Sequence, residues 1–191
     1  MDVAQNIGYP LLFALIAIET MGIPVPGETA LITAGVLASR GHLSIEIVIA
    51  LAAAAAIVGD NVGFAIGRHG GRRVLTAEGP FLSHRLALLA VGEPFFERHG
   101  PKAVFLGRWV AGLRITSAWM AGINRMPWPR FLFYNALGGI AWATSIGLLA
   151  YFVGAGIETI IKDVGVGAAI LVVVALVGAI VVMRRRRSGV P

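Results

Sequence analysis

Apolar residues occur in five long runs along the chain, separated by short polar stretches. The last run, Val164 to Met183, contains twenty residues without a charge. At about 1.5 Å per residue it is roughly 30 Å long, which is enough to cross the hydrocarbon core of a bilayer. We therefore expect an all-α integral membrane protein. The five runs cover residues 9–38, 43–67, 103–123, 131–156 and 164–183.

Two of these runs are unlikely to be simple spans because glycine or proline interrupts them. The first is broken where Pro24, Pro26 and Gly27 lie close together, and two prolines in one turn prevent a straight helix. The third is short and carries Arg108 and Arg114 together with Gly107 and Gly112. We expect re-entrant hairpins or broken helices at 9–38 and 103–124, with the breaks lining a cavity, since lipid cannot satisfy exposed backbone groups.

The distribution of basic residues predicts the orientation of these segments. The linker 68–102 holds six arginines and lysines, whereas 158–163 holds one, and four arginines follow the last run. The positive-inside rule places the linker and the C-terminus in the cytoplasm. The two hairpins then enter from opposite faces, which predicts two inverted repeats, each a hairpin followed by a spanning helix at 43–67 or 131–156, as in secondary transporters. Residues 1–156 would form this domain, and 157–191 an additional helix and basic tail.

Composition supports this class and excludes others. Hydrophobic residues make up 57% of the 191 residues and charged residues 14%, with a mean hydropathy of +0.81. The net charge of +6 is gathered beside membrane segments, so we expect it to attract anionic lipid head groups rather than nucleic acid. Cysteine is absent and the four histidines lack the spacing of metal ligands, so we expect no metal and no cofactor.

Three smaller features concern the linker, the N-terminus and the packing between helices. The linker mixes apolar and basic residues, which favours a helix lying on the cytoplasmic membrane surface over a plain loop. The N-terminus lacks the basic region of a cleaved signal peptide, so we expect the first apolar run to be retained. Small-residue faces, such as the one formed by Gly59, Gly63 and Gly67, indicate close helix packing and permit a homodimer.

Five charged residues lie in the interior of the apolar runs, where each costs roughly 2.5 to 3.5 kcal/mol at mid-membrane. They must be paired, solvated or partly neutralised, and one interpretation is internal salt bridges alone. We favour a substrate path, because a purely structural pair is replaceable by apolar residues at little loss. The five residues are Glu19, Glu28, Asp60, Arg108 and Arg114.

Four of these five residues also have a simpler explanation. Glu28 follows the prolines at the start of a helix, where an acid complements the helix dipole, and Asp60 would suit a hydrogen bond to a neighbouring helix. Glu19 has no such alternative. Arg108 and Arg114 suit phosphate or carboxylate and could face one cavity, although snorkelling to the interface is an alternative. Three acids against two arginines favour holding a proton on one acid.

An ordered series of motifs extends from Glu19 to Trp142. It consists of Glu19-Thr20, Pro24–Glu28, Gly59-Asp60 through Gly63 to Gly67-Arg68, Phe96–Gly100, Phe105–Arg114, Ala121-Gly122, Met126, Phe131, Asn135, Gly138 and Trp142. This series resembles the DedA family, also called the SNARE-associated or VTT-domain family, and the resemblance covers roughly residues 9 to 156.

The resemblance implies two facing re-entrant hairpins in a bacterial-type inner membrane. It also implies lipid translocation that depends on the proton motive force, with undecaprenyl phosphate recycling and phospholipid flipping as leading activities. The family's essential acids fall on Glu19 and Glu28, where the second is often aspartate, and its essential arginines on Arg108 and Arg114. Asp60 matches a frequent but variable position.

The leading hypothesis is a translocase in which the two arginines bind an anionic lipid head while Glu19 and Glu28 relay or gate protons. Undecaprenyl phosphate is the preferred substrate through the family, and Asn135 is assigned a supporting place. Alternatives are a proton-coupled small-ion exchanger and a scramblase for phosphatidylethanolamine or other phospholipids. A lipid phosphatase or intramembrane protease is disfavoured because the catalytic motifs of such enzymes are absent. A pure scaffold would not explain three acids in apolar runs.

Overall fold

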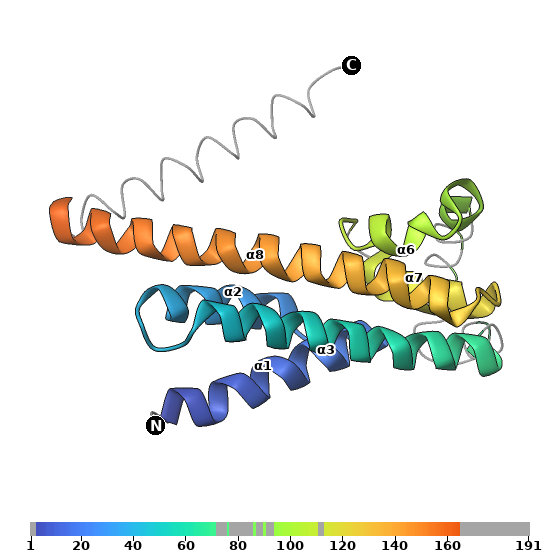
Figure 1. Cartoon of the computed structure of the whole chain (residues 1–191), viewed down its shortest axis with the longest axis horizontal. Helices are drawn as coiled ribbons and strands as arrows, with labels where there is room; N and C mark the ends of the chain where they lie inside the picture. The colour runs from blue at the N-terminus through green and yellow to red at the C-terminus, as the bar shows by residue number, and fades with distance from the viewer. Residues whose placement is uncertain are drawn as a thin grey trace, which may run out of the picture.

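The computed structural model describes residues 3–71, 94–110 and 113–164, together with 76, 86 and 90. All regular secondary structure in this part of the chain is helical, which agrees with the expected all-α class (Figure 1). The elements are α1 (Val3–Met21), α2 (Gly27–Ser39), α3 (Ile45–Ile66), a π-helical turn (Gly67–Gly71), α6 (Lys102–Gly107), α7 (Leu113–Ile123) and α8 (Trp128–Val164).

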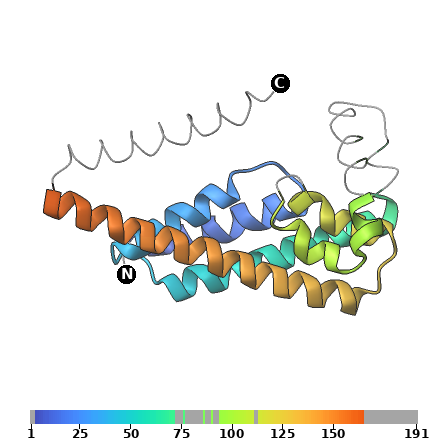
Figure 2. The same cartoon turned by 90° about the horizontal axis from the view of Figure 1, so that it is seen from above.

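Two helical hairpins lie against two long helices. Helices α3 and α8 pack along each other, α1 and α2 form the first hairpin beside them, and α6 and α7 form the second. Figures 1 and 2 show the first hairpin near one end of the long helices and the second near the opposite end, so that their tips approach each other midway along the molecule. The chain thus brings two breaks in helical structure to one place.

The first break lies where the prolines predict it. Helix α1 ends at Met21, Gly22 adopts a φ of +120°, and α2 begins at Gly27. A φ in this range favours glycine because a side chain would clash with the backbone. Pro24 and Pro26 lie in the connecting segment and do not continue either helix.

Both hairpin and span boundaries differ somewhat from the expected ones. Helix α1 begins at Val3 rather than at residue 9, and its early turns are tied to the α2–α3 connection because the Ser44 N–H donates to the Tyr9 hydroxyl at 2.9 Å. Helix α8 continues past Gly156 to Val164, so the polar stretch expected as a connection is helical. Gly154 lies within this helix, at a point where α8 packs closely against Val36 of α2.

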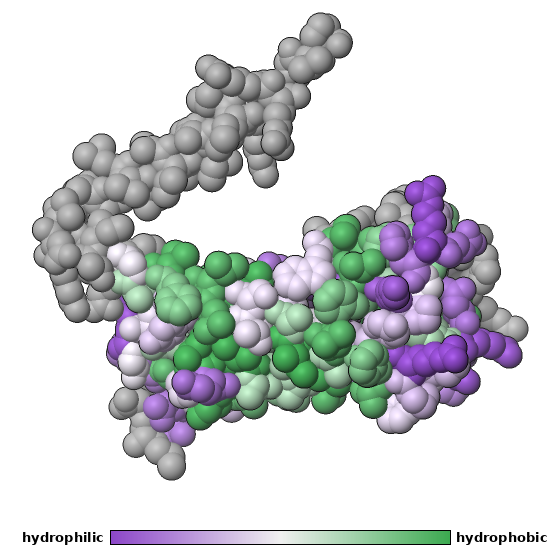
Figure 3. Space-filling model, turned by 45° about the horizontal axis from the view of Figure 1, so that its top comes forward, coloured by the Kyte–Doolittle hydropathy of each residue, from purple (hydrophilic) through white to green (hydrophobic). Residues whose placement is uncertain are grey.

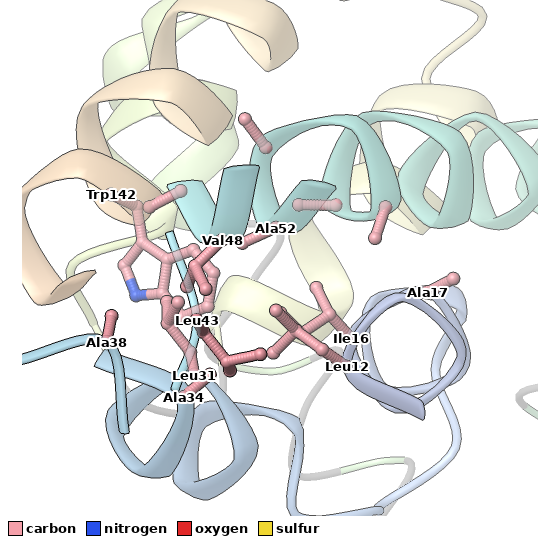
Figure 4. Packing of buried hydrophobic residues seen from close by; sticks show 14 residues of the cluster. Leu12, Ile16, Ala17, Leu31, Ala34, Ala38, Leu43, Val48, Ala52 and Trp142 are labelled. Atoms are coloured by element: carbon pink, nitrogen blue, oxygen red, sulfur yellow. The ribbon is translucent and has the colours of Figure 1, made fainter. Parts of the chain in front are cut away.

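The core of the first half combines side chains from α1, α2, α3 and α8. Figure 4 shows Leu31 and Val48 near the indole ring of Trp142, with Ile16 of α1 farther from the ring in the same cluster. These three aliphatic side chains are fully buried. Because α3 contributes mainly alanines to this layer, the neighbouring helices lie close to its backbone.

The glycine face of α3 has the packing role that its spacing predicts. A side chain at Gly59 would collide with Thr20 and the main chain of α1, and one at Gly67 would collide with the main chain of α7 at Trp119. Trp119 also covers Gly63. One face of α3 therefore receives both hairpins, through close approach of α1 and α7.

The molecular surface carries an apolar belt between more polar ends (Figure 3). Two described helices are long and apolar enough to cross a membrane, namely Ile45–Gly70 with 26 residues and Trp128–Gly156 with 29. The expected helix 164–183 and its arginines lie outside the described residues, as does most of the linker. In the described part of that linker, residues 94–99 are helical and Phe96 is buried.

Candidate functional site

The two hairpin tips are joined directly by a tryptophan of the second hairpin. Trp119 of α7 donates its indole N–H to the main-chain oxygen of Met21 at 2.9 Å. Met21 is the last residue of α1, where carbonyl groups lack helical partners. The indole also lies against Gly22, where a Cβ would come within 3.0 Å of the ring nitrogen. Trp119 thus fixes the end of the first hairpin against the second.

Arg114, in the first turn of α7, forms a bridge between two carboxylates of the first hairpin. Its Nη2 donates to Glu19 Oε1 at 2.5 Å and its Nη1 to Glu28 Oε2 at 2.8 Å. The guanidinium carbon lies 5.2 Å from the centroid of the Trp142 ring, which is a cation–π contact. One arginine therefore connects α1, α2 and α8.

Glu19 has a second role that its position in the sequence does not reveal. Its carboxylate accepts a hydrogen bond from the Glu28 backbone N–H, and a Cβ at Gly27 would collide with Glu19 Oε2. Glu19 therefore caps the beginning of α2 across the break, and Gly27 leaves the space for it. We expected capping from Glu28 alone; Glu28 lies in the first turn of α2, but Glu19 satisfies a backbone donor there.

The two acids bound to Arg114 differ in exposure. The Glu19 side chain is 9% exposed, whereas the Glu28 side chain is 45% exposed. Arg114 itself is 14% exposed. Glu28 consequently lies at the exposed edge of this cluster, and Glu19 lies in its interior.

Arg108, directly after α6, forms a second and deeper cluster. Its Nη2 donates to the Asp60 carboxylate on α3 and to the Asn135 side-chain oxygen on α8, the latter at 2.7 Å. Asn135 in turn donates to the main-chain oxygen of Ile57 at 3.3 Å. The Arg108 and Asp60 side chains are only 1% and 5% exposed. The hydrogen bond that Asp60 makes to a neighbouring segment is thus also a buried ion pair.

Part of this deeper cluster has no hydrogen-bond partner. Arg108 Nε and Nη1 and Asp60 Oδ1 are buried and unpaired. Three of the five guanidinium N–H bonds are thus unsatisfied, because Nε carries one hydrogen and Nη1 two. Leaving buried donors on a charged group unpaired is costly. A group able to accept hydrogen bonds would complete this site.

The two clusters together contain all five ionisable residues expected from the apolar runs. With every group ionised, Arg108 and Asp60 balance, while Arg114 faces two carboxylates. The surplus negative charge therefore belongs to the more exposed cluster. The charge of Arg114 also acts on Asp60, so the clusters are electrostatically connected.

Sequence reasoning found the charges but missed their aromatic and amide neighbours. The Trp142 ring lies against the Arg114 guanidinium, and Trp119 joins the two hairpins. Asn135 entered only through the family resemblance, although an amide within an apolar run is itself a signal. No group of three or more potential metal ligands occurs among the residues described by the structure.

An all-helical architecture with apolar spanning helices, two opposed hairpins and buried charges at their tips defines a membrane protein of a type consistent with transport. The family model described as the VTT domain matches residues 25–155. The chain is 32% identical to Protein DedA of Escherichia coli strain K12 over 188 residues, covering 94% of this chain and 84% of that protein. The chain belongs to the DedA family of VTT-domain membrane proteins, which confirms the resemblance seen in the motifs.

Other relatives agree with this assignment. An uncharacterised membrane protein of Synechocystis is 42% identical over 153 residues, which is 80% of this chain and 70% of that protein. An uncharacterised membrane protein of Mycobacterium bovis is 37% identical over 184 residues, which is 94% of this chain and 84% of that protein. None of these names is that of an enzyme. No solved structure matches the chain.

Proposed function

We propose that this protein translocates a lipid with an anionic phosphate head group across the membrane, with undecaprenyl phosphate as the preferred substrate. The observation that carries the proposal is Arg108, a buried guanidinium with three unpaired N–H bonds that lies between the second hairpin and the two long helices. Arginine donors match phosphate oxygens in geometry and charge. Cargo without acceptor oxygens would leave these donors unsatisfied.

The relative exposure of the two clusters suggests an order of contact. A head group arriving from the surface would meet Arg114 first, because Glu28 on that side is exposed. Arg108 lies deeper, at the level where α3 and α8 pack together through Asp60 and Asn135. Acyl or isoprenoid tails would remain in lipid along the apolar belt seen in Figure 3. In this scheme only the polar head crosses between the hairpins.

Proton coupling is the second part of the proposal. Three carboxylates against two guanidinium groups leave one surplus charge, and a buried surplus charge is relieved by binding a proton. Glu19 and Glu28 would relay or gate protons as the site opens to alternate faces. Because both belong to the first hairpin and Arg114 to the second, a change in their charge would alter the contact between the hairpins.

We also propose an arrangement in the membrane. The hairpins would be re-entrant and enter from opposite faces, giving two inverted repeats with the site near the midplane. The basic linker and the C-terminus would lie in the cytoplasm of a cell with a bacterial-type inner membrane, where anionic lipid heads attract them. A homodimer is compatible with this arrangement.

The test is leaflet exchange of labelled undecaprenyl phosphate and phosphatidylethanolamine in proteoliposomes with an imposed pH gradient. We expect exchange of the phosphate lipid by the wild type and its loss in Arg108→Gln and Glu19→Gln. The matched controls are Arg130→Gln and Glu46→Gln, which remove exposed charges outside the clusters and should retain exchange.

Three results would contradict the proposal. Exchange no faster than in empty vesicles would exclude a translocase for these lipids, and ion-dependent pH changes in the same vesicles would then favour the small-ion exchanger. Equal exchange of both lipids, independent of the gradient, would favour a scramblase. Unchanged exchange of undecaprenyl phosphate by Arg108→Gln would show that the buried guanidinium does not bind the head group.

A further inference from the structure

We infer that Asp60 is the group that takes up the coupling proton, and that its carboxylate and the anionic head group occupy Arg108 in alternation. This inference rests on the proposed function. It assigns the proton to the deeper cluster, rather than to the two glutamates that carry the surplus charge.

The first argument is the free oxygen of Asp60. Asp60 Oδ1 is buried and unpaired, while the other oxygen of the same carboxylate binds Arg108. A proton can therefore add to Oδ1 without first breaking the ion pair. The Glu19 carboxylate differs because it already accepts from Arg114 and from a backbone N–H.

The second argument is charge balance in an enclosed space. Arg108 and Asp60 form a neutral pair within protein. Adding an anionic head group would leave net negative charge where desolvation costs several kcal/mol per ion. Protonation of Asp60 offsets one unit of that charge, weakens its bond to Nη2 and frees Arg108 for the phosphate oxygen. One proton bound at Asp60 therefore accompanies the head group at Arg108.

The third argument is that Asn135 can hold the guanidinium during the exchange. It accepts from the same Nη2 that binds Asp60, and it is anchored by its own hydrogen bond to the Ile57 carbonyl. When Asp60 becomes neutral, this neutral acceptor still fixes one side of Arg108. Asn135 is thus a positioning residue that orients the unpaired Nε and Nη1.

The surroundings of Asp60 do not offer a competing counter-ion. Among the described residues, the charged groups that face it are Arg108, after α6, and Arg114, on α7. The glutamates of α1 and α2 are both bound to Arg114. Helix α8 contributes the uncharged Asn135. Protonation of Asp60 would therefore act mainly on Arg108.

The experiment is infrared difference spectroscopy of reconstituted protein on addition of undecaprenyl phosphate, together with lipid exchange in the same vesicles. We expect the wild type to gain a C=O band of a protonated carboxylic acid that shifts in D2O. The band should change frequency in Asp60→Glu, disappear in Asp60→Asn and persist in Glu28→Gln. Exchange by Asp60→Asn should become equal with and without the pH gradient.

The possible failures are distinguishable. Lipid exchange by the wild type without a carboxylic acid band would overturn the role of Asp60 and leave the translocase intact. A band that survives Asp60→Asn but vanishes in Glu19→Gln or Glu28→Gln would assign the proton to a glutamate instead. Absence of exchange by the wild type would overturn the proposed function and this inference together. If Asp60→Asn does not fold, the wild-type band and its frequency in Asp60→Glu decide the question.

Discussion

Replacing Arg108 by methionine tests whether the deeper ion pair serves stability alone. The substitution keeps an unbranched apolar stem but leaves Asp60 as a carboxylate that is 5% exposed and has lost its bonded counter-charge. Breaking a buried pair in this way costs about 3–5 kcal/mol. Adding Asp60→Asn removes the stranded charge. Asn135 loses its donor in both variants, so that loss cancels when the single and double variants are compared.

The expected difference between these variants can be worked out from the chemistry of an ordinary carboxylic acid. A stranded aspartate escapes its charge by binding a proton, which at pH 7 costs about 4 kcal/mol for a group that ionises near pH 3.9. The double variant should therefore be more stable than Arg108→Met by about 4 kcal/mol at pH 7. This gap should shrink by about 1.4 kcal/mol for each unit by which the pH is lowered.

Reversible unfolding in mixed dodecyl maltoside and dodecyl sulfate micelles, followed by circular dichroism, measures the free energies of unfolding. Equal stability of the single and double variants at pH 7 would refute the buried pairing of Arg108 with Asp60. Lipid exchange is measured on the same preparations. We expect the double variant to regain stability without exchange, whereas recovery of both would support a purely structural ion pair.

Three further substitutions test the packing around the site. Gly59→Ala should destabilise the protein by about 1–3 kcal/mol through overpacking against α1, while Gly156→Ala, with open space around its Cβ, should be neutral in the same unfolding assay. Trp119→Phe should lower the free energy of unfolding by about 1 kcal/mol, because it loses the hydrogen bond to the end of α1. Its control is Trp128→Phe, which loses an exposed hydrogen bond and should cost less. Equal losses of stability in the two variants would contradict this prediction. Phe131→Ala should lower the free energy of unfolding by about 3–5 kcal/mol, because the fully buried Phe131 ring stacks on Phe64 of α3. An unfolding midpoint equal to that of the wild type would contradict this packing.

Features that depend on a residue's own backbone, charge or spacing are predictable from the sequence. Proline and glycine act on their own backbone, so the break between α1 and α2 is predictable from Pro24 and Pro26. The cost of charge in lipid likewise identifies all five clustered residues before their partners are known. Gly59 is predictable for a similar reason, since its spacing on a helix requires no knowledge of the partner helix.

Pairing between distant segments is less predictable, because it depends on how the helices meet. Arg108 could have paired with any of the three acids, and only the placement of α3 selects Asp60. The capping role of Glu19 arises across the break, between a side chain of α1 and the backbone of α2. The end of α8 was missed because polar residues after Gly156 continue the helix as readily as they would end it.

Helix α6 is so short that it consists almost entirely of helix ends. In a six-residue helix most backbone N–H and C=O groups have no partner within the helix, and an isolated helix of this length is unstable in water. Its place depends on buried side chains such as Ala103 and Val104. The backbone that carries Arg108 is therefore held by side-chain contacts more than by its own hydrogen-bond ladder. Amide hydrogens of residues 102–110 should exchange faster than those of α3, and Arg108 can shift with this short segment while the two long helices stay in register.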